Sequence, residues 1–139
     1  MKRILVDTGP LVAILSPEDE YHAACVNALR EMPGPLLSCW PVITEAAWLV
    51  RKSPRAVQRL LRSIDGAFLE LLPLAGAEAE AIAALMKRYE DIHPQLADAA
   101  LVYLASREKI ETIFTLDRRD FSIYRSARRS TFRIVPETE

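Results

Sequence analysis

Short apolar runs alternate along the chain with longer segments of helical periodicity, and this alternation restricts the fold more than any other feature. The helical segments cover residues 10–15, 21–32, 41–50, 54–64, 76–89 and 95–108, and the apolar runs cover residues 4–7, 36–39, 68–72, 113–117 and 132–135. Strands that alternate with helices are typical of a parallel sheet covered on both faces. We therefore predict an α/β fold in which helices flank both faces of a central, mainly parallel sheet of about five short strands.

Length and composition limit the chain to one domain, residues 1–139. Half of the 139 residues are hydrophobic, which is enough for one core and too few for two. The formal net charge of -1 gives no overall attraction to nucleic acid or to anionic membranes. No apolar run approaches the roughly 18–20 residues that span a bilayer, and Cys25 and Cys39 lack metal-binding spacing. We expect a cytoplasmic protein with reduced thiols and no membrane partner.

Asp7 stands where the first apolar run ends and the first helix is expected to begin. Gly9 and Pro10 end the strand, and Pro10 suits the first helical position because its missing N–H would have no partner there. In open α/β sheets, ligands bind at the carboxyl edge of the strands. Asp7 is therefore either a helix cap or a residue with a chemical role in ligand binding or catalysis.

Four carboxylates interrupt or end apolar segments, namely Asp7, Glu45, Asp98 and Asp117. A buried carboxylate must be protonated, ion-paired or bound to a cation. No Lys or Arg lies within a turn of Asp98, and Arg51 and Lys52 lie more than a turn from Glu45. Local ion pairing therefore fails for both of these acids.

The expected positions of the four acids bring them together. Asp7 and Asp117 each follow a buried strand, whereas Glu45 and Asp98 lie near the starts of helices. Helices in right-handed crossovers begin at the carboxyl edge of the preceding strand, so all four side chains can reach one cleft. Oxygen ligands without His or Cys favour Mg²⁺ or Mn²⁺ over zinc, and a divalent ion would relieve their mutual repulsion. Glu70, by contrast, is expected on the solvent face of an edge strand.

Four motifs resemble those of the PIN-domain nucleases, and among these the VapC-like toxins are similar in length and motif order. The motifs are ILVDTGPL at residues 4–11, Thr44-Glu45, LADA at residues 96–99 and TLDRRDF at residues 115–121. The resemblance spans essentially the whole chain. It implies a PIN-like fold and a Mg²⁺- or Mn²⁺-dependent ribonuclease with Asp7, Glu45, Asp98 and Asp117 as its site. It also implies a homodimer held inactive by a small cognate antitoxin.

Several neighbouring residues are candidates for auxiliary roles in a two-metal hydrolysis of RNA. The hydroxyls of Thr115 and Thr8 could orient a carboxylate or a water. Many relatives carry a further Asp where this chain has Gln95, which reduces the negative charge at the cleft. Asp120 either compensates for that loss or caps the turn after Asp117.

Two basic stretches could contact RNA phosphates or an acidic antitoxin. One contains Arg51, Lys52, Arg55, Arg59 and Arg62, and the other contains Arg118, Arg119, Arg125, Arg128 and Arg129. The alternative is a solvated helix face and a basic tail. The second stretch follows Asp117 directly, which favours a contact with phosphate.

An apolar set on two consecutive helical segments could form part of a homodimer face or an antitoxin groove. Its members are Trp48, Leu49, Val57, Leu60, Leu61 and Ile64. Ordinary core packing is the alternative for the same residues.

Three other functions are weighed against the nuclease. A phosphoaspartyl enzyme of the haloacid dehalogenase kind needs a second Asp where Gly9 stands and a Lys near a late strand, and no Lys follows Lys109. A receiver-type signalling module also needs a late Lys, as well as an acid beside Asp7. The nearer alternative is a PIN-like domain that only binds RNA or a partner, although a binding module gains nothing from burying unpaired charge.

Overall fold

Within residues 2–66, 68–126 and 130–137, which the computed structural model describes, five strands form one parallel sheet. Each neighbouring pair of strands is parallel, and the order across the sheet is β3-β2-β1-β4-β5. The strands are β1 (Ile4–Val6), β2 (Leu36–Ser38), β3 (Leu69–Leu71), β4 (Thr112–Phe114) and β5 (Arg133–Val135). The predicted sheet is confirmed.

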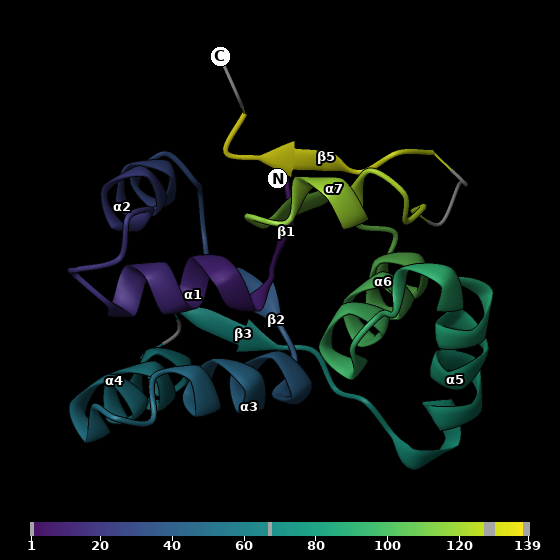
Figure 1. Ribbon diagram of the computed structural model, residues 1–139, viewed down its shortest axis with the longest axis horizontal. Coiled ribbons are helices and arrows are strands. Elements are labelled where there is room, and N and C mark those ends of the chain that lie inside the picture. The colour runs from purple at the N-terminus through teal and green to yellow at the C-terminus, as the bar shows by residue number, and fades with distance from the viewer. Residues whose placement is uncertain (1, 67, 127–129, 138–139) are drawn as a thin grey trace.

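Helices cover both faces of the sheet. Every residue of β1, β2 and β4 is buried, and successive side chains of a strand point to opposite faces, so both faces must be covered. Helices α1 to α4 gather on one side of the molecule and α5 and α6 on the other (Figure 1). The helices are α1 (Thr8–Leu15), α2 (His22–Arg30), α3 (Trp40–Leu49), α4 (Pro54–Asp65), α5 (Ala79–Arg88), α6 (Leu96–Glu108) and α7 (Arg118–Phe121).

The strand order reverses between β1 and β4. The chain moves outward from β1 through β2 to β3, then crosses back to β4 on the other side of β1 and continues to β5. Ligands of open parallel sheets bind at such a reversal, outside the carboxyl ends of the two strands. Here the segments after β1 and β4 run side by side, since the Asp7 N–H donates to the Phe114 carbonyl at 2.9 Å.

Some element boundaries differ from the predicted ones. Helix α1 begins at Thr8, so the expectation that Pro10 opens it is wrong, and Pro10 is its third residue. The first four N–H groups of any helix lack internal partners, so a proline is tolerated throughout that turn. The helix predicted over residues 76–89 is divided into a 3₁₀ turn, η1 (Gly76–Glu78), and α5, and a second 3₁₀ turn, η2 (Glu90–Ile92), precedes α6. Helix α7 was not predicted.

Two simpler expectations concern the edge of the sheet and the membrane. Glu70 lies on the edge strand β3 with its side chain exposed, as predicted. Across the described residues, the helices are all too short or too polar to cross a membrane. Cys25 and Cys39 are both buried free thiols.

Candidate active site

The four predicted carboxylates line one cavity of about 830 Å³. They come from four separate elements, and the sequence-based expectation that they converge is met in space. The other residues that line the cavity are Thr8, Gly9, Trp48, Leu49, Gln95 and Leu116. The cavity opens at the carboxyl edge of β1 and β4, where the strand order reverses.

Asp7 is the most buried of the four acids, with 6% of its surface exposed. Its Oδ2 accepts a hydrogen bond of 2.9 Å from the Thr115 hydroxyl, whereas its Oδ1 is buried without a partner among the described residues. Burial, together with the carboxylates of Asp98 and Glu45, raises the pKa of Asp7 to about 7, against the opposing effects of the Thr8 backbone N–H and the Thr115 hydroxyl. Asp7 is therefore an acid that favours either a proton or a cation.

Thr115 joins the ends of the two central strands. Its hydroxyl donates to Asp7 and accepts the N–H of Asp117 at 3.0 Å, and the residue is fully buried. One side chain thus fixes an acid that follows β1 relative to an acid that follows β4. Thr8 also lines the cavity, and its buried Oγ1 has no partner in the part of the chain that is described.

Asp117 is the N-cap of α7, whereas Asp120 was predicted to cap this turn. Its Oδ1 accepts the Asp120 N–H at 3.0 Å, so Asp117 caps the turn, and the expectation that Asp120 does so is wrong. Asp120 lies outside the residues that line the cavity. Its partial burial, followed by the Asp117 carboxylate, raises the pKa of Asp120.

Asp98 and Glu45 reach the cavity from helices. Asp98 lies in the first turn of α6, and its Oδ2 accepts the Gln95 N–H at 3.1 Å. Burial and then the carboxylates of Glu45 and Asp117 raise the pKa of Asp98. Glu45 is the sixth residue of α3 and so lies near the start of that helix, as expected. Both side chains are half-buried.

The acid cluster has no cationic partner within the described residues. The ion pairs found there involve Arg3, Arg107 and Arg133, and none includes a site acid. In the same residues, no group of three or more His, Cys, Asp or Glu side chains is arranged to hold a metal ion as it stands. The negative charges of the four acids repel one another. The Gln95 and Asp120 backbone N–H groups donate to Asp98 and Asp117 and hold these two side chains in place. The chemistry of the donors nevertheless fits a hard divalent ion, because all are oxygens and Oδ1 of Asp7 is buried without a partner.

The predicted basic residues lie in different settings. Arg51, Arg55 and Arg119 are exposed, and the Arg51 guanidinium stacks on the Trp48 ring at 3.7 Å. Arg118 donates instead to the Pro136 carbonyl at 2.7 Å, so part of its side chain secures the C-terminal segment. Lys52, Arg59 and Arg62 are exposed as well, Arg125 donates to backbone carbonyls, and Arg128 and Arg129 lie outside the described residues.

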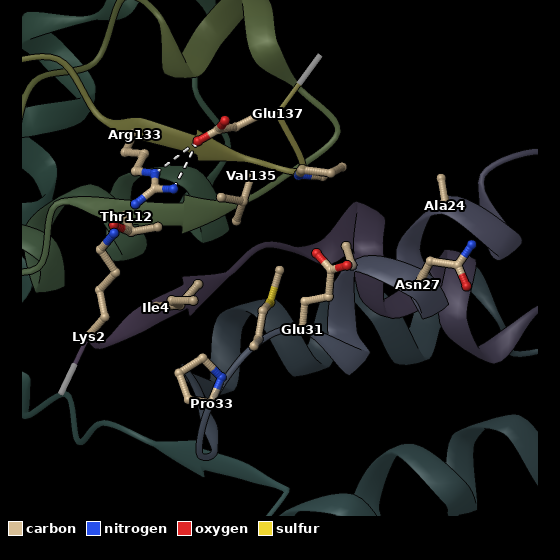
Figure 2. A pocket seen from close by; sticks show the side chains of 13 residues that line it. Lys2, Ile4, Ala24, Asn27, Glu31, Pro33, Thr112, Arg133, Val135 and Glu137 are labelled. Atoms are coloured by element: carbon tan, nitrogen blue, oxygen red, sulfur yellow. Dashed lines mark hydrogen bonds and ion pairs between the residues drawn. The ribbon is translucent and has the colours of Figure 1, made fainter. Parts of the chain in front are cut away.

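A second cavity lies away from the acids, between α2 and the sheet (Figure 2). It measures about 490 Å³, and Lys2, Glu31, Arg133 and Glu137 give it charges of both signs. Arg133 and Glu137 pair with each other at 2.9 Å. Because neither sign of charge dominates and no site acid lines it, this cavity adds nothing to the acidic site.

Sequence reasoning missed the apolar wall of the acidic cavity. Trp48 and Leu49 line the acidic cavity, although the sequence suggested either an association surface or core packing for them. Their spacing from Glu45, three and four residues along α3, could have indicated this, because such neighbours share a helix face. Tyr124 is buried with its hydroxyl unpaired among the described residues, and no local sequence pattern singles it out.

Comparison with known proteins agrees with this geometry and identifies the class. The PIN domain model matches residues 4–126, so the chain belongs to the PIN-domain family. It is 33% identical to Ribonuclease VapC26 of Mycobacterium tuberculosis over 135 residues, which cover 96% of this chain and 100% of that protein. The chain is thus a PIN-domain ribonuclease of the VapC toxin type, as predicted.

A solved structure supports the fold. VapC20 of Mycobacterium tuberculosis, described as a toxin that cleaves the sarcin-ricin loop, superposes with a TM-score of 0.73 at 15% identity, covering 79% of this chain and 86% of that one. This likeness confirms the predicted PIN-like architecture. Proteins of this kind are generally dependent on divalent metals. The relatives favour the nuclease over a domain that only binds RNA or a partner.

Proposed function

We propose that this chain, as one domain over residues 1–139, is an endoribonuclease in which Asp7, Glu45, Asp98 and Asp117 hold Mg²⁺ or Mn²⁺. The observation that carries this proposal is the convergence of four carboxylates, without a cationic partner in the described residues, on a cavity that contains the unpaired Oδ1 of Asp7. When bound, divalent ions would neutralise charge on the phosphodiester and activate the attacking water.

The protein's own groups prepare the site for that chemistry. Burial and the Asp98 carboxylate hold the pKa of Asp7 near 7, so a proton competes for this carboxylate at neutral pH. The Thr115 hydroxyl, which donates to Oδ2, fixes the orientation of Asp7 and leaves Oδ1, which has no partner in the described residues, available to a cation. Glu45 lines the cavity and forms no ion pair in the described residues, so its carboxylate would also be available to a cation. Thr115 is thus a positioning residue.

RNA is the proposed substrate, and the exposed arginines supply positive charge beside an acidic cavity. Arg51 lies one turn beyond Trp48, which lines the cavity, and its guanidinium plane is already stacked on an aromatic ring. Arg55 and Arg119 are exposed and available to phosphate. An acidic segment of a cognate antitoxin could occupy the same arginines and so block the site.

The association surface is smaller than the apolar set suggested by the sequence. Trp48, Leu49 and Leu61 are exposed by 62%, 55% and 45% of their surfaces, so core packing is the wrong reading for them. Leu60 is only 2% exposed and Ile64 packs against the core, which makes core packing the right reading there. Val57 is half-buried. We propose that the exposed three form part of a homodimer or antitoxin contact.

The test is cleavage of a labelled single-stranded RNA by the purified chain. Internal cuts that require Mg²⁺ or Mn²⁺ and disappear in EDTA would support the proposal, and cleavage that persists in chelator would refute it.

We place the protein in the cytoplasm, where free thiols such as Cys25 and Cys39 stay reduced.

A further inference from the structure

A groove between α3 and α6 opens beside the acidic cavity and shares part of its wall. The two helices pack against each other, and the groove measures about 610 Å³. One side of α3 contributes Trp40, Glu45 and Trp48, and the start of α6 contributes Gln95 and Leu96. Glu45, Trp48 and Gln95 also line the acidic cavity. A ligand in this α3–α6 groove therefore lies directly beside the site acids.

Both tryptophans of the chain line the α3–α6 groove, and both are exposed. Trp40 is 58% exposed and Trp48 is 62% exposed. They are eight residues apart on the same side of α3, which places them about 12 Å apart along the helix axis. Leu96, which is also exposed, adds apolar surface from α6. Exposed apolar side chains that gather in one place mark a binding surface.

The two indole rings differ in what already stacks on them. The Arg51 guanidinium lies over the Trp48 ring at 3.7 Å from its centroid, so one face of that ring is covered by a planar cation. No ring or cation stacks on Trp40 within the described residues. The Trp40 indole is therefore an open planar surface, and a flat ligand can stack on it without displacing a protein group.

The position and size of the groove indicate the kind of ligand. A phosphodiester held at the acids carries a nucleoside on each side, and the surfaces that border the acidic cavity are the nearest ones to receive their bases. Bases of single-stranded RNA stack on aromatic side chains whatever their sequence. The groove volume falls within the range of small-ligand sites, whereas a stable protein contact buries about 800 Å² on each partner. These properties favour a base over a protein segment.

We propose that the α3–α6 groove is a base-binding subsite for the RNA substrate, in which Trp40 stacks on a base that flanks the cleaved bond. This inference rests on the proposed function. Trp48, which lines both cavities, connects the subsite to the acids. The subsite favours single-stranded RNA, because a base inside a duplex is already stacked on both faces. Trp48 also belongs to the exposed set proposed for association, so a protein bound there would compete with the RNA.

The first test removes one base at a time from the substrate. Once the cleaved bond of a single-stranded RNA is mapped, RNAs with one abasic ribose at each flanking position are compared. In the wild type, one such position should raise KM by about 10-fold or more with little change in kcat, because a stacked base contributes binding energy. Trp40→Leu should raise the KM of the intact RNA similarly and lose the response to that abasic position. Trp40→Phe keeps an aromatic face and should recover much of both.

Tyr21→Leu is the matched control, because Tyr21 is an exposed aromatic residue that lines neither the groove nor the acidic cavity. It should leave KM and the response to abasic RNA unchanged. If the wild type and Trp40→Leu respond equally to every abasic position, the proposal is overturned. If Trp40→Leu weakens dimerisation in sedimentation equilibrium and leaves all RNA parameters unchanged, the groove is a protein interface and the proposal is wrong.

Tryptophan fluorescence gives a second measurement in which the groove is unaltered. Both tryptophans line the groove, so their emission reports on it alone. Asp98→Asn, which should not cut RNA, keeps both rings. Its emission should be quenched by single-stranded RNA in Mg²⁺, and less so by RNA that lacks the flanking base. Unchanged emission at RNA concentrations that saturate binding in an anisotropy assay would contradict the proposal.

Failure of the subsite is distinguishable from failure of the proposed function. A wild type that cuts no RNA in Mg²⁺ or Mn²⁺ refutes the proposed function and this inference with it. A wild type that cuts RNA while Trp40→Leu matches it in KM, kcat and the abasic series refutes the subsite alone.

Discussion

The Thr115 hydroxyl donates to Oδ2 of Asp7 at 2.9 Å and accepts the Asp117 N–H at 3.0 Å, so one buried side chain fixes two acids that follow neighbouring strands. Thr115→Val keeps the shape of the side chain and removes both bonds. We expect a loss of about 1–3 kcal/mol in unfolding free energy, because a carboxylate oxygen and an N–H lose their partner, together with weaker catalysis. Urea denaturation and an RNA-cleavage assay measure the two effects. Thr115→Ser retains the hydroxyl and should recover most of both, and a Ser variant as impaired as the Val variant would contradict this role.

Metal removal should abolish catalysis. The purified chain is expected to cut RNA with Mg²⁺ or Mn²⁺, to stop in EDTA and to work poorly with Zn²⁺ alone, because its donors are all oxygens. The ion should also stabilise the fold, by about 2.7 kcal/mol at a concentration 100 times its Kd. Melting curves with and without Mn²⁺ measure this stabilisation. A melting temperature that does not respond to saturating Mn²⁺ would argue against the site.

Asp98→Asn separates a metal ligand from a structural ion pair. The amide keeps the shape of the side chain and can still accept the Gln95 N–H, but it removes a charge from the cluster. Cleavage should fall by orders of magnitude. Stability in EDTA should hold or rise, because crowded like charges are relieved, whereas breaking a buried ion pair would cost about 3–5 kcal/mol. The control is Glu70→Gln on the exposed edge of β3, which should change neither quantity. A strongly destabilised Asp98→Asn that still cuts RNA would overturn the assignment.

Asp7 should make the metal-free protein more stable in mild acid. Its pKa is about 7 in the folded state against an ordinary value of 3.8, so the folded state binds the proton more tightly than the unfolded state. The resulting stabilisation is complete below about pH 4 and is lost as the pH rises through about 7, and it amounts to a few kcal/mol. Melting temperatures in EDTA across this range should fall with rising pH in the wild type and fall less in Asp7→Asn. An identical slope in both proteins would contradict the raised pKa.

The exposed apolar residues of α3 and α4 predict association. Sedimentation equilibrium of the wild type should show a monomer–dimer transition with concentration, and Trp48→Ser combined with Leu61→Ser should shift it toward monomer. Ile123→Ser removes an exposed side chain that follows α7 and should leave the transition unchanged. A wild-type monomer at all concentrations, also unaffected by a cognate antitoxin, would exclude this surface.

The sequence predicts the sheet and the four acids because both depend on local patterns. Apolar runs that end in Asp7 and near Asp117 mark the strands, and burial without basic neighbours marks the acids. The details of the turn after β4 could not be predicted in this way. Asp117 and Asp120 are both acceptable caps by residue type, and only the backbone direction decides that Asp117 accepts the N–H of Asp120.

Tertiary packing decides the rest. Leu60 and Leu61 are adjacent leucines in α4, yet Leu60 lies in the core and Leu61 on the surface. Which of the two is buried depends on how α4 is rotated against its neighbours, and the residue type does not reveal this. The same holds for Tyr124, whose burial depends on its packing against Tyr89, a residue far away in the sequence.

The hydrogen bond between Asp7 and Thr115 joins residues 108 positions apart, and this separation bears on how the protein is made. Asp7 and Glu45 are synthesised long before β4. During most of translation the growing polypeptide therefore contains these acids without the strand that completes their surroundings. Residues so far apart meet only after nearly the whole polypeptide has left the exit tunnel. We therefore expect a nascent chain to be inert toward the messenger RNA that it is made from, because its acidic site is complete only after β4 has emerged.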